Sequence, residues 1–478
     1  MQIEIPQPQT YAERFQCTGS ACEDTCCQGW TVPLDRATFD RYQALPPSPL
    51  KVLIDRSVER VASDPTSPAP ANPAAVTAGG KPTYARIRMN EANECPLLTT
   101  DHLCGVQKEL GEAMLSHTCA TYPRIVHSLA GVREMALTLS CPEAARLVLL
   151  TPDLAGTWPN HTPVSVLAAA AMDDKATEPL PANFWAIRAA VLRIVQNRVY
   201  PLWQRMFLLD LLCRRLDLIA RGELNRPVPE FLAEFEATVA TGALRKAMES
   251  LPADGAAQLD VVLRLAGMML HKSNVRPRFV AAIKTFTAGI GNGPGATLES
   301  LTARYAQAQD RTFAPFCERN PHMMENFLIN TIVRCQFPFG RDGMKAGAPA
   351  TSAHQGKARE FALLAAQFAL MRGLLIGAAG FHGAAFSSTH VIEMVQPATK
   401  HFEHHPEFLP LAHALLVERG MDGARGLAIL LRDAAAKEPG PVRDPAQGRG
   451  QGQAQGAGES RPAAPAIPVP AQPAGRPV

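Results

Sequence analysis

Apolar residues recur along most of this chain at the three-to-four-residue spacing of an amphipathic helix. Two such stripes run through residues 184–195 and 208–219. Pro201 precedes the second stripe, where a first-turn proline costs no hydrogen bond, and Gly222 fits its end. The same spacing predicts further helices over residues 228–250, 256–272, 323–335, 356–377 and 409–436.

Strand patterns are rare, and two segments lack the composition of a regular element. Val132–Leu139 alternates apolar and polar residues and predicts a strand. Residues 62–83 are rich in Pro, Ala and Gly and predict a flexible insertion. Residues 438–478 are dominated by Pro, Gly, Gln and Ala and predict a disordered tail. We therefore expect a mainly α-helical protein.

The most apolar stretch, Ala362–Phe381, contains Gln367 and Arg372 and is rich in Ala and Gly. This composition favours a buried helix over a membrane span. The first residues, MQIEIPQPQT, show no basic stretch followed by an apolar core, so no secretory signal is expected. The formal net charge of +3 argues against a dedicated nucleic-acid binder. These features predict a cytoplasmic protein without membrane insertion.

Cysteines are concentrated near the start of the chain. Eight of the eleven are Cys17, Cys22, Cys26, Cys27, Cys95, Cys104, Cys119 and Cys141. In a reducing cytoplasm such clustering favours metal ligands or redox groups over structural disulfides or merely buried thiols. The other three, Cys213, Cys317 and Cys335, lie in apolar helical stretches and are expected in the core.

Thiolates suit iron–sulfur clusters, zinc and copper(I), and either a four-iron cluster or a structural zinc takes four of them. Eight thiols can serve one cluster plus a second metal, or one cluster plus redox or buried thiols. The spacing alone leaves these alternatives open. It predicts an irregular cysteine-rich metal-binding module over residues 1–150, packed on an α-helical body over residues 151–437.

The cysteines lie in two blocks of sequence. The first is Cys-Glu-Asp-Thr-Cys-Cys-Gln-Gly-Trp over residues 22–30. The second runs from Cys-Pro-Leu-Leu at 95–98 to Cys-Ala-Thr-Tyr-Pro-Arg at 119–124, and Leu-Ser-Cys-Pro-Glu-Ala-Ala at 139–145 continues it. These blocks resemble those of the flagellin lysine-N-methylase (FliB-type) family. The segment from Glu325 to Phe339 resembles the family's helical region. Outside the insertion and the tail, the resemblance covers most of residues 10–435.

This resemblance implies a protein-lysine N-methyltransferase that transfers a methyl group from S-adenosylmethionine to lysines of flagellin. It also implies a [4Fe–4S] cluster held by the cysteine module. The module alone is similar to that of small cysteine-cluster proteins that chelate zinc or iron. A non-catalytic protein that chelates or delivers metal, with zinc as the alternative metal, is therefore one rival hypothesis. A redox or scaffold component whose cluster only stabilises the fold is another.

Two common methyltransferase signatures are missing from the sequence. We find no glycine-rich turn after a first strand, and Gly373–Gly383 follows a helix and is typical of close helix packing. The common radical loop has the spacing Cys-x3-Cys-x2-Cys, whereas Cys22-x3-Cys26 is followed at once by Cys27. The sequence therefore identifies no catalytic or donor-binding residue.

Other polar and aromatic residues have a structural interpretation that competes with a functional one. Tyr122 and Arg124 predict a turn that packs the module, and Trp30 predicts a hydrophobic lid over it. A solvated helix face is expected for His401, His404 and His405. Helix capping or packing and a role near the substrate lysine are equally plausible for Glu325 and Asn326.

Overall fold

A computed structural model describes residues 11–29, 31–61, 83–129, 132–154, 170–172, 178–270, 275–340, 356–403, 405 and 407–433. The predicted flexible insertion, apart from Thr83, and the predicted disordered tail lie outside these ranges. In the described part the chain is mainly helical, as the sequence predicts.

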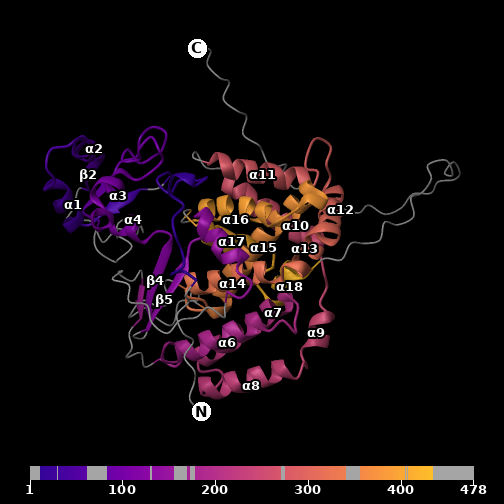
Figure 1. Ribbon diagram of the computed structural model, residues 1–478. Coiled ribbons are helices and arrows are strands. Elements are labelled where there is room, and N and C mark those ends of the chain that lie inside the picture. Colours follow the sequence, from indigo (N-terminus) through magenta and orange to yellow (C-terminus); the bar gives the residue numbers. More distant parts are fainter. Residues whose placement is uncertain are drawn as a thin grey trace, which may run out of the picture.

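The N-terminal region forms a small unit with its own hydrophobic cluster, on one side of the molecule in Figure 1. Asp35 caps the first helix by accepting a hydrogen bond from the Thr38 backbone N–H at 2.8 Å, and Ser48 caps the second from Lys51 at 3.1 Å. Its elements are η1 Gly19–Ala21, β1 Val32–Leu34, α1 Arg36–Gln43, α2 Pro49–Ser57, β2 Val58–Arg60, β3 Ala85–Ile87, α3 Gly105–Leu110, η3 Glu112–Met114 and α4 His117–Thr121. The strands pair antiparallel in the order β1-β3-β2.

A second sheet connects this unit to the helical body. Strands β4 Arg124–Leu129 and β5 Val132–Leu137 pair antiparallel, and β6 Ala170–Met172 joins β4 in parallel. The predicted strand at Val132–Leu139 is thus confirmed as β5. It leads into helix α5 Pro142–Leu150. The sheet is fixed to the body by Asn330, whose side chain donates to Leu137 O at 2.8 Å and accepts from Leu137 N at 3.2 Å.

The helical body follows the predicted stripes. Its elements are η4 Pro181–Asn183, α6 Phe184–Gln196, α7 Leu202–Ala220, α8 Val228–Ala240, α9 Arg245–Glu249, α10 Gly255–Leu270, α11 Pro277–Gly289, α12 Leu298–Ala308, the π-helical turn η5 Gln309–Phe313, α13 Ala314–Arg319, α14 Pro321–Arg334, α15 Lys357–His382, η6 Gly383–Ala385, α16 Ser388–Phe402, α17 Phe408–Glu418 and α18 Ala424–Leu431. The apolar residues of both stripes are buried in the main core.

Two of the predicted helices are wrong as single elements. The segment 228–250 divides into α8 and α9 around Gly242, and 409–436 divides into α17 and α18 around Gly420. Both glycines adopt positive φ, +71° and +63°, which a continuing right-handed helix does not allow. The helices predicted at 256–272, 323–335 and 356–377 are confirmed as α10, α14 and α15.

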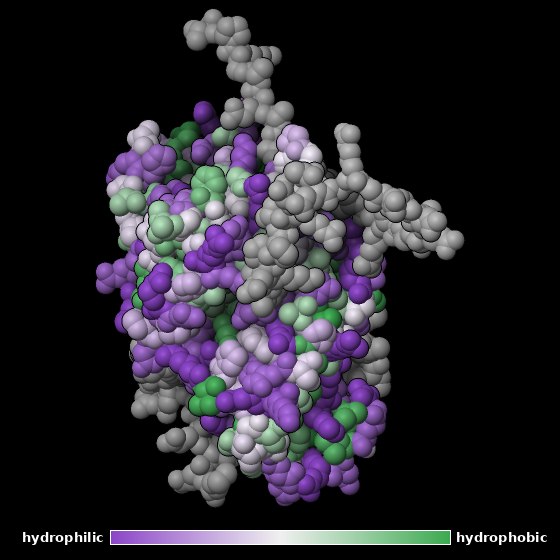
Figure 2. All heavy atoms as spheres, turned by 90° about the vertical axis from the view of Figure 1, so that its right-hand side faces the viewer, coloured by the Kyte–Doolittle hydropathy of each residue, from purple (hydrophilic) through white to green (hydrophobic). Residues whose placement is uncertain are grey.

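Helix α15 lies at the centre of the body and contacts α7, α10, α11, α12, α16, α17 and α18. It is long and apolar enough to cross a membrane, yet the apolar window that meets this test is entirely buried within the protein. Close approach along it depends on glycines, as predicted: Cβ atoms at Gly373 and Gly377 would lie 2.5 Å from Val262 and 2.3 Å from Phe286. On the face shown in Figure 2, apolar and hydrophilic residues intermingle, while the large apolar cluster is internal.

Candidate functional site

The structure gathers most of the predicted cysteine ligands at the N-terminal unit. The Cys95 N–H donates to Cys27 O at 2.7 Å, which places the second cysteine block against the first. A β-bridge joins Leu98 to Cys104 and turns that cysteine back toward Cys95. Cys119 lies in the short helix α4, whose start is capped by Ser116.

Four of these thiols interact electrostatically and so lie near one another. Burial, with smaller contributions from the charges of Cys104 and Cys26, raises the pKa of Cys95 to about 11. Burial likewise raises the pKa of Cys119 to about 12, with the same two cysteines and Cys95 acting in the same direction. A hydrogen bond with Cys27, followed by burial, raises the pKa of Cys26. Cys95, Cys104 and Cys119 thus pack in one cluster, and Cys26 lies beside it through its contact with Cys27.

Of the remaining predicted ligands, Cys27 lies against Cys95, whereas Cys141, Cys22 and Cys17 lie outside the hydrophobic cluster that contains Cys95. Cys141 precedes α5, and burial raises its pKa to about 12, with Cys22 and Cys26 contributing. Cys22 is half-buried, while Cys17 is exposed and accepts a hydrogen bond from the Gly19 N–H at 3.4 Å. Cys26 interacts electrostatically with Cys95 and Cys119 as well as with Cys141.

These residues match a thiolate-ligated metal in kind and number. All eleven cysteines lie in the described ranges and none is in a disulfide. Among the described residues, however, no group of three or more His, Cys, Asp or Glu side chains is arranged to hold a metal ion. Thiols with raised pKa values hold their protons at neutral pH, and a metal ion would displace those protons on binding. The thiols are therefore gathered, but not in coordination geometry.

The cysteine loop is clamped by helix α16 through buried charges that the sequence did not reveal. Lys400 Nζ donates to Asp24 Oδ1 at 2.6 Å and to Thr25 O at 2.9 Å. Gln396 Nε2 donates to Asp24 Oδ2 at 2.6 Å and to Ser140 O at 2.8 Å. Lys400 and Asp24 are 5% and 10% exposed, so this ion pair is shielded from solvent. Asp24 was visible within the cysteine string, but nothing local to it identified Lys400 as its partner.

Helix α11 holds the same loop from a second direction. Arg276 Nη2 donates to Gly29 O at 2.9 Å, and Arg278 Nη1 donates to Glu23 O at 3.1 Å. Gly29 has a φ of +82°, and a Cβ there would lie 2.3 Å from Arg276 Nη2. Only glycine meets both conditions. Beside this contact, Arg276 and two more arginines, Arg86 and Arg88, line a polar cavity of about 450 Å³.

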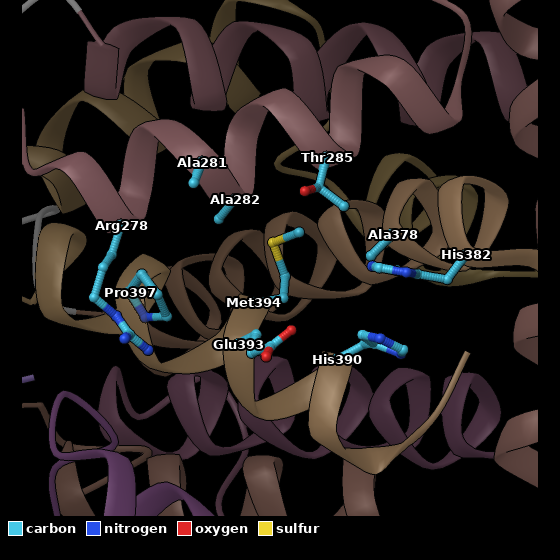
Figure 3. Close-up of a pocket in the computed structure, with 10 residues that line it drawn as sticks. All are labelled: Arg278, Ala281, Ala282, Thr285, Ala378, His382, His390, Glu393, Met394 and Pro397. Atoms are coloured by element: carbon cyan, nitrogen blue, oxygen red, sulfur yellow. The ribbon is translucent and has the colours of Figure 1, made fainter. Parts of the chain in front are cut away.

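A groove of about 260 Å³ runs along α16 from this clamp (Figure 3). Arg278 and Pro397 line one end, and His382 and His390 line the other. The two imidazole rings stack with centroids 3.6 Å apart and an angle of 17° between their planes. Glu393 lies between the two ends on α16. Sequence reasoning did not identify this groove, because its residues come from three separate helices.

The other residues weighed from the sequence have mostly structural roles. The Tyr122 hydroxyl lies 3.1 Å from Ser140 Oγ and Arg124 donates to Phe15 O at 2.9 Å, so both pack the module as predicted. Glu325 is buried between Arg198 and Arg205, and Asn326 donates to Thr151 O at 2.7 Å. Trp30 and His404 lie outside the described residues.

Two expectations about these side chains were wrong. His401 and His405 do not form a solvated face: His401 stacks on Phe279 at 4.3 Å and His405 is buried. Stacking on the apolar ring of Phe279 determines the position of His401, although the neighbours of His401 in the sequence are polar. Cys213 is buried in the core as expected, and Cys317 packs against that core, whereas Cys335, at the end of helix α14, is only half-buried.

Comparisons with known proteins agree with the resemblance found in the sequence. Residues 188–430, just over half of the chain, match the family model of the FliB lysine N-methylase C-terminal domain. The chain is 34% identical over 153 residues to Lysine-N-methylase of Salmonella typhimurium, which covers 32% of this chain and 34% of that protein. It is 33% identical over 153 residues to Flagellar biosynthetic protein FliU of Salmonella muenchen, which covers 32% of this chain and 80% of that protein. The match thus spans about a third of the lysine-N-methylase, and no solved structure matches the chain.

Proposed function

The chain belongs to the FliB lysine N-methylase family, and from this premise we propose that it is a protein-lysine N-methyltransferase that acts on flagellin in the cytoplasm. The observation that carries the proposal is the family match over residues 188–430. The printed names of the relatives, a lysine-N-methylase and a flagellar biosynthetic protein, support the reaction and the flagellar substrate.

We further propose that S-adenosylmethionine is the methyl donor and that the cysteine module holds an iron–sulfur cluster of the [4Fe–4S] type. The mutual proximity of Cys26, Cys95, Cys104 and Cys119 supports these four as its ligands. Bound there, the cluster would supply an iron that can chelate the amino-carboxylate of the donor, or a redox centre. Cys27, Cys22, Cys141 and Cys17 would be neighbouring thiols.

Transfer to lysine requires an uncharged amine. The new N–CH3 bond forms as the CH3–S bond of the sulfonium breaks, the thioether leaves, and the ammonium gives up one proton. Because a lysine in water holds that proton to a pH of about 10.4, the protein must desolvate the amine or provide nearby charge that favours its loss. The role of the chain's own residues is thus to exclude water, position the side chain and accept a proton.

A metal-chelating or metal-delivery protein remains the second candidate, and one observation favours it. Cys17 is exposed, so metal could pass from this thiol to another protein. With zinc in place of iron, the same module would give a colourless protein.

The deciding experiment is mass spectrometry of flagellin from cells with and without this gene. We expect methylated lysines only where the gene is present. Unchanged lysine masses would refute the methylase proposal. Anaerobic purification gives the second measurement: iron, sulfide and visible absorption are expected, and each should fall in a protein carrying Cys95→Ser and Cys119→Ser. A zinc-containing, colourless protein would instead support the chelating function.

A further inference from the structure

The groove along α16 starts at the cysteine loop. Arg278, which lines its first end, donates from Nη1 to Glu23 O, and Glu23 lies between Cys22 and Asp24. Pro397, on the same end, follows Gln396 of the Asp24 clamp. A group held in this groove would therefore face the part of the protein where the proposed function requires the methyl donor.

The walls of the groove suit an unbranched hydrocarbon chain. Ala281 and Ala282 contribute methyl groups from α11, Ala378 contributes one from α15, and Met394 contributes its side chain from α16 (Figure 3). A single water occupies about 10–15 Å³ on a comparable measure, so a cavity of about 260 Å³ has room for a side chain of several methylenes.

One solvent-exposed carboxylate, that of Glu393, lies midway along these walls and interacts electrostatically with His382. Within the part of the chain that the structure describes, Glu393 has no hydrogen bond and no ion pair, and its side chain lines the groove. It follows His390 by three residues and precedes Pro397 by four, about one helical turn from each. Glu393 is exposed at the mouth of the groove, where its carboxylate can pair with a cation that enters from the histidine end.

At the end of the groove lined by His382 and His390, an exposed side chain is available to contact a substrate protein. Phe381 is 54% exposed and packs edge-on against His382, with ring centroids 5.0 Å apart. His390 Nδ1 accepts the Ser387 backbone N–H at 3.1 Å, so its ring is fixed at the start of α16. Burial, together with the neighbouring His390, lowers the pKa of His382, which favours a neutral imidazole that does not repel an incoming cation.

We propose that this groove is the acceptor site for the lysine side chain, which enters beside Phe381 and places its ammonium on Glu393, with its methylenes against Ala282 and Met394. This inference rests on the proposed methylase function. Glu393 holds the lysine as its ammonium and can accept the departing proton, and the positive charge of Arg278 at the far end favours that transfer. The proposal assigns substrate binding to α11, α15 and α16, apart from the cysteine ligands.

Kinetics with flagellin as substrate test the site. Loss of a solvent-exposed charge pair in Glu393→Gln should raise the KM for flagellin by about fivefold and leave the KM for the donor unchanged. Ala281→Trp, at an exposed wall position, should block the groove and give the same pattern. Glu299→Gln, an exposed carboxylate on α12, is the matched control and should change neither constant. A flagellin KM within twofold of wild type in both groove variants would overturn the proposal.

Binding measured without turnover separates this proposal from the methylase proposal. Nα-acetyl-lysine amide is added to the labelled full-length protein, and the imidazole NMR signals of His382 and His390 are followed after assignment with single His→Gln variants. We expect shifts with this probe, none with the norleucine analogue that lacks the amine, and none in Glu393→Gln. Equal shifts with both probes, or shifts that survive Glu393→Gln, would refute the site. If the wild type binds the amine selectively but never methylates flagellin, the methylase proposal alone fails.

Discussion

Replacing Gly377 by alanine should destabilise the helical body, although alanine is the better helix former. A Cβ at this position would lie 2.3 Å from Phe286 Cδ2 and 2.8 Å from the Phe286 carbonyl oxygen. Carbon atoms in contact sit about 3.5–4.0 Å apart, so α11 and α15 would have to separate by roughly 1 Å. Overpacking of this kind costs about 1–3 kcal/mol, and the upper end applies because a backbone atom cannot rotate away. After the helix-propensity gain of about 1 kcal/mol, the expected net loss is about 2 kcal/mol.

The matched control is Gly267→Ala in helix α10. No atom lies within 4 Å of a Cβ built there, so only the propensity gain of about 1 kcal/mol should remain. The free energies of unfolding of both variants and of wild type are measured in urea by far-UV circular dichroism. We expect the two variants to change stability in opposite directions and to differ by about 3 kcal/mol, the sum of the gain and the net loss. A Gly377→Ala protein as stable as Gly267→Ala would refute the packing argument.

Three further substitutions probe charges and contacts, two of them at the cysteine loop and one at the start of α15. Lys400→Met leaves the Asp24 carboxylate buried without its cation, so the free energy of unfolding in urea should fall by roughly 3–5 kcal/mol. The variant should also retain less iron per protein. Unaltered stability and iron content would contradict the clamp. Gly29→Ala forces a strained φ and displaces Arg276, so it should lower iron content, while Gly222→Ala, also at positive φ but with open space around it, should not. Burial lowers the pKa of Lys357, so between that value and about 10.4 the unfolded chain binds more protons and stability rises with pH. The stability of wild type relative to Lys357→Met should therefore increase from pH 8 to pH 10, and a constant difference would exclude this contribution.

The helical fold class could be predicted from the spacing of apolar residues. Packing each apolar stripe against neighbouring helices leaves its helical period unchanged. The two divided helices show the limit of that reasoning. Gly222 was recognised as a helix end, yet Gly242 and Gly420 lie inside apolar patterns that continue on both sides. Whether such a glycine takes positive φ depends on where the next helix must pack, and this is decided by the whole body rather than by the local sequence.

Of the candidate site, only the cysteines could be predicted from the sequence. Their clustering in the sequence indicated that they meet, and backbone bonds between the two blocks bring Cys27 beside Cys95. The charges that hold them come from far along the chain: Gln396 and Lys400 reach Asp24 across 372 and 376 residues. No periodicity or spacing encodes a pair so distant. The groove was missed for the same reason, since His382, His390 and Glu393 acquire a shared role only once α11, α15 and α16 pack together.

The clamp between Asp24 and Lys400 can form only late in the biosynthesis of this protein. A ribosome adds about 5–20 residues per second, so the 376 residues between the two side chains take about 20–75 s to synthesise. Throughout that interval the first cysteine loop has left the ribosome while the helix that fixes it does not yet exist. Under the proposed function, a metal would therefore be inserted into the finished chain, and until then the early thiols would need the reducing capacity of the cell to stay free for it.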